Sequence, residues 1–94
     1  MADILESRQK IDEIDRGISS LFIKRMEAAR EIADYKVKHG MDILDKKREE
    51  EKLEALKKDV PCEMSYYIGE LYKRIFELSR EYQKEQMDWN GSGL

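Results

Sequence analysis

The sequence predicts an all-α fold of three helices, one long and two shorter. Charged residues make up 41% of the 94 residues and hydrophobic residues 40%, with five Gly and one Pro, a composition that suits amphipathic helices better than strands. Apolar residues also recur at three- and four-residue steps through most of the chain, which is the period of a helix with one buried face. A chain of this length fits one domain, which we expect to cover residues 1–88, followed by a flexible tail at 89–94.

The long helix is predicted from Asp3 to about Lys38, a stretch with no Pro and with Gly17 as its one Gly. Its apolar residues keep the helical period: Ile4, Ile11, Ile14, Ile18, Leu21, Phe22, Ala28, Ala29, Ile32 and Tyr35. At about 1.5 Å per residue, this helix would be on the order of 50 Å long, which is longer than a domain of this size is wide. Part of it therefore needs a partner from outside, and Gly40 should end it as a C-cap glycine.

Two shorter helices follow the long one. Asp45 is a good N-cap for the second helix, which we expect over residues 46–58. The segment 59–61 breaks this helix, and Pro61 suits the first position of the third helix. The apolar stripe of the third helix ends near Met87 and consists of Met64, Ile68, Leu71, Ile75, Leu78 and Tyr82.

The charge and the cysteine content argue against several classes of function. A net charge of −3 disfavours nucleic acid as a partner, because the phosphate backbone favours a basic face. Cys62 is the one Cys, so neither an intramolecular disulfide nor a cysteine metal cluster is expected, in keeping with a reducing cytoplasm. The first ten residues lack the apolar core of a signal peptide, and no apolar run approaches the roughly 20 residues of a membrane span. We therefore expect a soluble cytoplasmic protein that binds neither nucleic acid nor membranes.

Two cations interrupt the apolar seam of the long helix. The seam runs through positions 11, 14, 18, 21, 25, 28, 32 and 36, where positions 25 and 36 are Arg25 and Lys36. Eleven residues at 100° each make nearly three full turns, so both side chains project from the same side. A buried cation without a partner is costly, so anions are expected nearby. Asp or Glu on the other helices could supply them, the long stems could carry the charges to water, or a ligand could bind there.

Arg8 adds a geometric argument for a dimer. It lies seventeen residues before Arg25, roughly 25 Å along a straight helix, so no small ligand can touch both from one chain. If two copies pair antiparallel about an axis near residues 18–20, Arg8 of one copy falls opposite the stretch from Arg25 to Lys36 of the other. Gly17 and the two serines of that segment are small enough for close approach. We therefore predict an intertwined helical homodimer, with a solvated surface role for Arg8 as the alternative.

Polar residues also lie on the inward faces of the two shorter helices. Asp45, Arg48 and Glu49 share one face of the second helix by the three- and four-residue rule. Ser79 and Gln83 end an inward stripe of the third helix. Each group has an ordinary explanation, namely an acidic cap with a local ion pair and partial exposure near a helix end. Together with the three cations of the long helix, they suit a small, multiply charged anion that carries a hydroxyl.

These residues give the chain its resemblance to a known family. From Glu6 to Gln86 it resembles the all-helical, bacterial-type class of chorismate mutase. The stretch LESRQKIDEIDRGISSLFIKRMEAAREIADYK is similar to that family's first helix, DKKRE to the start of its second and SREYQ to part of its third. All eight functional positions of the bacterial pattern hold matching residue types: Arg8, Arg25, Lys36, Asp45, Arg48, Glu49, Ser79 and Gln83. The departures, a short connection at residues 59–62 and the loop before the second helix, touch none of these positions.

The resemblance implies conversion of chorismate to prephenate, in the biosynthesis of Phe and Tyr. This reaction is an intramolecular Claisen rearrangement that needs no cofactor and no metal. The substrate is a dianion with an ether bridge and a ring hydroxyl. The resemblance implies that Arg25, and Arg8 of the second subunit, bind the two carboxylates in bidentate fashion, the geometry to which Arg is suited. Arg48 and Ser79 would assist at a carboxylate.

The resemblance also implies the residues that act on the rest of the substrate. Glu49, with Asp45 beside it, would receive the ring hydroxyl. Lys36 and Gln83 would donate to the ether oxygen, where negative charge grows as the C–O bond breaks. Lys36, Gln83, Arg25 and Glu49 are therefore the expected catalytic residues, and all eight positions are expected to bind substrate.

Two alternatives stay open. The first is an isochorismate pyruvate-lyase, although those relatives do not keep intact the Asp-x-x-Arg-Glu stretch or the Ser of the third helix, both of which this chain has. The second is a non-catalytic helical dimer that serves as an interaction or regulatory module. Such a dimer would be expected to hold Leu or Ile at positions 25 and 36, as coiled coils prefer. Arg25 and Lys36 argue against it.

Overall fold

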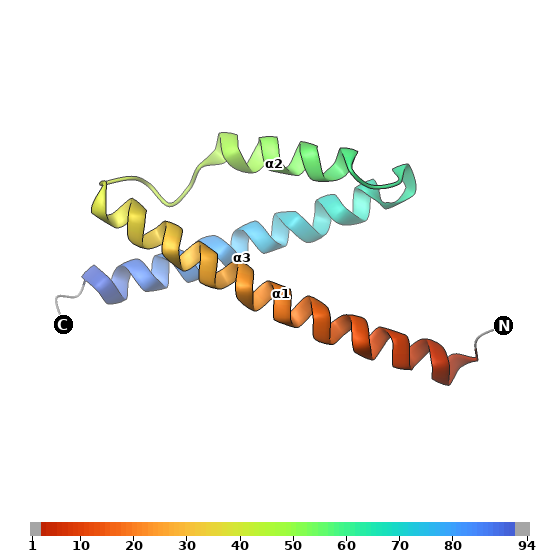
Figure 1. Ribbon diagram of the computed structural model, residues 1–94. Coiled ribbons are helices and arrows are strands. Elements are labelled where there is room, and N and C mark those ends of the chain that lie inside the picture. Colours follow the sequence, from red (N-terminus) through yellow and green to blue (C-terminus); the bar gives the residue numbers. More distant parts are fainter. Residues whose placement is uncertain (1–2, 92–94) are drawn as a thin grey trace.

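The computed structural model describes residues 3–91 and is all-helical over that range (Figure 1). Its elements are α1 (Ile4–Lys38), α2 (Lys46–Lys58), the short 3₁₀ turn η1 (Cys62–Met64) and α3 (Ser65–Gly91). One helix is long, two are shorter, and no strand occurs in this range, so the predicted fold class of the chain is confirmed. In the same range, no helix is both long enough and apolar enough to cross a membrane.

Three capping residues set helix ends where the sequence predicts them. The side chain of Asp3 accepts a hydrogen bond from the backbone N–H of Glu6 at 2.9 Å, so α1 begins directly after it. Gly40 has a φ of 63°, a left-handed conformation that glycine adopts at little cost, and it lies in the turn that ends α1. Asp45 accepts from the backbone N–H of Arg48 at 3.1 Å and begins α2.

The start of α3 differs from the prediction. Pro61 is not in the first turn of this helix, because it precedes η1 and its carbonyl accepts the backbone N–H of Met64 at 2.8 Å. The first α-helical residue is Ser65. A proline has a fixed φ and no N–H, which suits the cap of a tight 3₁₀ turn as well as the first position of an α-helix. The sequence pattern alone does not separate these two placements.

The end of α3 also lies later than predicted. The helix continues to Gly91, beyond the expected end near Met87, so the expected tail at 89–94 begins within the helix. A helix that is already nucleated adds each further residue at small cost, even where the residue is a poor helix former. Residues 1–2 and 92–94 lie outside the described residues.

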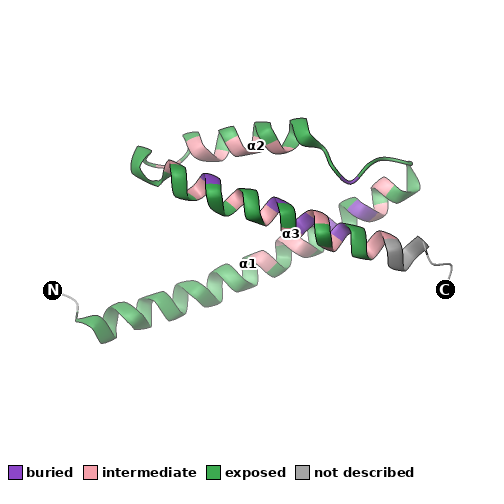
Figure 2. Cartoon of the chain, turned by 180° about the vertical axis from the view of Figure 1, so that it is seen from behind, coloured by how far each residue is buried: buried purple, intermediate pink, exposed green. Residues whose placement is uncertain are grey.

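α3 crosses the C-terminal half of α1 and runs beside α2, whereas the N-terminal half of α1 extends away from both (Figure 1). The chain is flat as a result, with principal extents of 58 × 30 × 14 Å. Buried apolar side chains gather near the crossing and in the loop before α2 (Figure 2), and they are Ala29, Ala33, Ile43 and Phe76. None of the large side chains in the described range is completely buried, so a single chain has a very small core.

Most of the predicted apolar seam of α1 is exposed in the single chain. Every residue from 3 to 21 is exposed, and α1 buries Ala29 and Ala33 alone among its residues. These alanines are small, which lets the backbones of α1 and α3 approach closely at the crossing. The predicted stripe of α3 is displaced in the same way, because Leu71 is exposed while Phe76, on the neighbouring face, is buried. The predicted apolar seams therefore coincide only in part with the surfaces that are buried within the chain.

Candidate functional site

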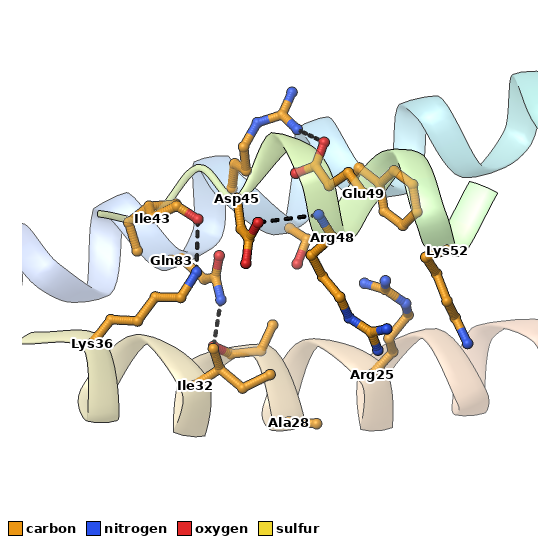
Figure 3. A pocket seen from close by; sticks show the side chains of 14 residues that line it. Arg25, Ala28, Ile32, Lys36, Ile43, Asp45, Arg48, Glu49, Lys52 and Gln83 are labelled. Atoms are coloured by element: carbon orange, nitrogen blue, oxygen red, sulfur yellow. Dashed lines mark hydrogen bonds and ion pairs between the residues drawn. The ribbon is translucent and has the colours of Figure 1, made fainter. Parts of the chain in front are cut away.

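A hollow of about 440 Å³ lies between the C-terminal half of α1, the beginning of α2 and the C-terminal half of α3 (Figure 3). Its volume is in the range of pockets that bind small molecules. Side chains from all three helices and from the loop before α2 line it: Arg25, Ala28, Ala29, Ile32, Lys36, Ile43, Asp45, Arg48, Glu49, Lys52, Phe76, Ser79, Arg80 and Gln83.

Seven of the eight predicted site residues line this hollow, and Arg8 does not. The seven are Arg25, Lys36, Asp45, Arg48, Glu49, Ser79 and Gln83. Arg8 is exposed on the N-terminal half of α1, about 25 Å along the helix from Arg25. Residues that the sequence separates by up to 58 positions are thus brought together by one chain, and Arg8 of that chain is left outside the pocket.

Among the described residues, no acid forms an ion pair with Arg25. Its guanidinium lies over the ring of Phe76, 5.6 Å from the ring centroid, in a cation–π arrangement. The ion pairs found among residues 3–91 involve neither Arg25 nor Lys36 nor Arg48. The ordinary explanation that Asp or Glu on the other helices supplies the counter-ions of Arg25 and Lys36 is therefore wrong, and the local ion pair that was the ordinary explanation for Arg48 is not formed among the described residues. These three cations face the hollow with their positive charge available to a ligand.

The ammonium group of Lys36 is held at the edge of the pocket. It donates a hydrogen bond to the backbone carbonyl of Ile43 at 2.9 Å, which ties the last turn of α1 to the loop before α2 (Figure 3). Ile43 is itself buried, so the acceptor is well fixed. An ammonium group has three N–H donors, and two of them remain for a ligand.

Gln83 and Ser79 are the buried polar residues at the crossing of α1 and α3. Their relative exposures are 6% and 9%, so they face inward as predicted, and the ordinary alternative of partial exposure near a helix end is wrong. The amide nitrogen of Gln83 donates to the carbonyl of Ala29 at 2.9 Å, a bond between residues 54 positions apart (Figure 3). That bond uses one of the two N–H groups of the amide and orients the other. Gln83 can therefore donate to a ligand from a fixed position without first taking up a proton.

The two acids of the pocket are already engaged. The side chain of Asp45 accepts the backbone N–H of Arg48 as the cap of α2. Glu49 forms an ion pair with Arg80 of α3 through one carboxylate oxygen. Five cations and two acids line the hollow, so its electrostatic potential favours an anion with more than one negative charge. In the part of the chain that is described, no three His, Cys, Asp or Glu side chains form a group that could hold a metal ion.

Comparison with protein families identifies this arrangement. A family model described as chorismate mutase type II matches residues 7–84. The chain belongs to this family. The match includes every residue that lines the pocket, and also Arg8. No curated protein and no solved structure gave a match to the chain.

Two charged residues of this chorismate mutase-type pocket were not predicted from the sequence, Lys52 and Arg80. Lys52 stands three residues after Glu49, so the helical rule that grouped Asp45 with Glu49 could have included it. Arg80 follows Ser79 directly and is therefore 100° away from it around α3, which places it outside the stripe that carried the prediction. Only the approach of α2 to α3 brings Arg80 to the pocket wall.

Proposed function

We propose that the chain is a chorismate mutase that converts chorismate to prephenate by an intramolecular Claisen rearrangement. The observation that carries this proposal is a set of cations without acidic partners that faces one hollow together with the fixed amide of Gln83. In the rearrangement one C–C bond forms as the ether C–O bond breaks, and no proton or electron enters or leaves. The catalyst therefore has to bind a flexible dianion in its compact reactive form and to stabilise charge at the ether oxygen.

The cations account for binding of the dianion. Arg25 lies in the wall of the pocket and presents a planar fork of N–H donors, which matches a carboxylate in bidentate fashion. Arg48, on the facing helix, has no acid partner among the described residues and would assist at a carboxylate with Ser79. Glu49 and Asp45 would receive the ring hydroxyl. Two carboxylates and one hydroxyl thus find partners of complementary charge.

Lys36 and Gln83 are the proposed donors to the ether oxygen. Both lie at the same end of the pocket in Figure 3, and each is held by a backbone carbonyl through one of its N–H groups. The remaining donors are oriented before the substrate arrives, so no reorganisation is needed as negative charge grows on the oxygen. Interactions that strengthen only as the C–O bond breaks favour the transition state over the bound substrate.

We further propose that the active form is a homodimer in which Arg8 of one copy completes the pocket of the other. The N-terminal half of α1 exposes a row of large apolar side chains that no other described part of the chain covers: Ile4, Leu5, Ile11, Ile14, Ile18 and Leu21. A stripe of this size on a soluble protein favours association with another surface. An antiparallel pairing near Ile18 would cover the stripe and bring Arg8 to the partner's pocket.

The proposed activity is tested by following the loss of chorismate absorbance with purified protein and with the Arg25→Ala variant. We expect prephenate as the product, and a loss of kcat/KM in the variant by about a thousandfold, because an unpaired carboxylate would remain in the pocket. Isochorismate is assayed in parallel. Release of pyruvate from isochorismate, without conversion of chorismate, would replace the mutase proposal with a lyase on the same fold.

The shared site is tested by intersubunit complementation. Arg8→Ala and Arg25→Ala each place one defect in every pocket of a dimer, so both pure variants should be nearly inactive. In mixed dimers, formed by refolding the two variants together, one of the two pockets is intact. Random mixing should therefore restore about a quarter of the native activity. No recovery on mixing, with mixed dimers demonstrated by differential tags, would mean that Arg8 does not act across the interface.

A further inference from the structure

The ion pair between Glu49 and Arg80 forms part of the pocket wall. It joins α2 to α3 across 31 positions of sequence, and each side chain is only 26% exposed. Both residues line the main hollow, and both also line a second hollow of about 270 Å³ to which α1 contributes no residue. The contact uses Nη1 of Arg80 and Oε1 of Glu49, so the other carboxylate oxygen, Oε2, stays outside the pair.

Without Arg80, the carboxylate of Glu49 would have other cations within reach. Lys52 lies three residues later on α2, a spacing at which helical side chains are neighbours, and it has no ion-pair or hydrogen-bond partner among residues 3–91. Arg25 faces the same hollow from α1. In Figure 3 the ion pair of Glu49 lies at the top of the pocket and Arg25 at the bottom. The pair thus holds a negative charge at the wall opposite Arg25.

We propose that Arg80 is a positioning residue for substrate binding. It holds Oε1 of Glu49 against α3, which leaves Oε2 for the ring hydroxyl of the substrate and keeps the acid from neutralising Lys52 and Arg25. The inference rests on the proposed function, because it assumes a dianionic substrate that competes with Glu49 for the same cations. An ion pair that served only to join α2 to α3 would affect folding, and its loss would not change KM in a way that depends on the charge of Glu49.

The experiment is a double-mutant cycle with Arg80→Met, Glu49→Gln and the combined variant, read as KM and kcat for chorismate. Arg80→Met should raise KM by about tenfold, which is within the coupling expected for residues of one ion-pair network, and change kcat much less. Glu49→Gln cannot compete for the cations, because its side chain is neutral. Adding Arg80→Met to Glu49→Gln should therefore change KM by less than about twofold.

Two further variants separate positioning from general effects. Arg74→Met is the matched control, because Arg74 also lies on α3 and pairs with a glutamate, Glu77 at 2.9 Å, but is exposed and lines neither hollow. It should leave KM unchanged. Arg80→Lys keeps the charge with a shorter reach and should recover most of the native KM. If Arg80→Met loses its helical circular dichroism signal, the same cycle is carried out with Arg80→Lys, whose smaller KM increase should likewise vanish beside Glu49→Gln.

The outcomes distinguish this inference from the proposed function. An equal rise of KM in the native and Glu49→Gln backgrounds, or no rise in either, would overturn the role of Arg80 while an active native enzyme would leave the mutase proposal standing. A native protein that does not convert chorismate would overturn both. A KM effect of Arg80→Met that is present only when Glu49 is charged would support the positioning role.

Discussion

The two halves of α1 carry the same apolar periodicity but have opposite surroundings. The C-terminal half contacts α3, buries Ala29 and Ala33 and supplies Arg25 and Lys36 to the pocket. The N-terminal half, residues 3–21, is exposed throughout, although it carries large apolar side chains (Figure 2). The half that packs within the chain therefore does so through two small residues, Ala29 and Ala33.

This difference indicates that the two halves of α1 have different roles. Small residues near the crossing allow α3 to approach until Gln83 reaches the carbonyl of Ala29, which fixes a donor in the pocket. Large residues in the other half present an apolar surface that none of the described residues covers. One half of α1 thus builds a site, and the other half is suited to bind a second copy that would complete it.

The largest effect is expected at Lys36, in the half that builds the site. Lys36→Ala should lower kcat by about 100- to 1,000-fold and change KM by less than about threefold, because the lost donor acts mainly on charge that develops in the transition state. Steady-state assays of chorismate loss measure both constants. Lys38→Ala, on the exposed side of the same last turn, should behave as the native protein. Near-normal turnover of Lys36→Ala would remove Lys36 from the proposed mechanism.

A smaller effect on the chemistry, and a large one on assembly, is expected at Ile18 in the other half. Ile18→Asp places a charge at the proposed crossing of the two copies of α1, where it would be desolvated beside its own symmetry mate. The dimer dissociation constant should rise by more than about a hundredfold. Sedimentation equilibrium measures the constant, and activity at low protein concentration should fall with it.

Gln9→Asp is the matched control for Ile18→Asp, because it adds the same charge to the opposite side of the same helical segment. It should leave the dimer intact. Equal dissociation of both variants would mean that the apolar stripe of α1 is not the interface. An unchanged dimer in both would mean that the copies associate elsewhere.

The smallest effect is expected from pH. Gln83 is a neutral donor, and the rearrangement transfers no proton, so kcat should change by less than about twofold between about pH 6 and pH 8. The pH profile is measured on a native protein whose dimeric state is checked at each pH. A steep loss of kcat over this range, in a dimer that stays intact, would mean that a titrating group has replaced Gln83 in the proposed role.

The helices were predictable because their ends carry local signals. Asp45 caps α2 and Gly40 ends α1 through interactions with residues that are near in sequence. Pro61 is also a local signal, but its fixed φ fits both a 3₁₀ turn and the first turn of an α-helix. The predicted start of α3 was wrong for that reason.

The pocket was predictable only in part. Periodicity placed Arg25 and Lys36 on one side of α1, and resemblance to the family supplied the remaining positions. The bond from Gln83 to Ala29 and the ion pair of Arg80 with Glu49 depend on how closely three helices approach, and no local pattern encodes that distance. The length of the long helix predicted that part of it would need a partner from outside, but periodicity identifies an apolar face without saying which surface covers it.

A single layer of helices with a smallest extent of only 14 Å buries few side chains, so the interior of one chain contributes little to its stability. If association with a second copy supplies the rest, dilution should act on this protein as a denaturant does, because the folded state is then linked to the concentration of its own chain. The melting temperature would rise with each increase in protein concentration, and a cell that made less of the protein would also hold a less stable form of it.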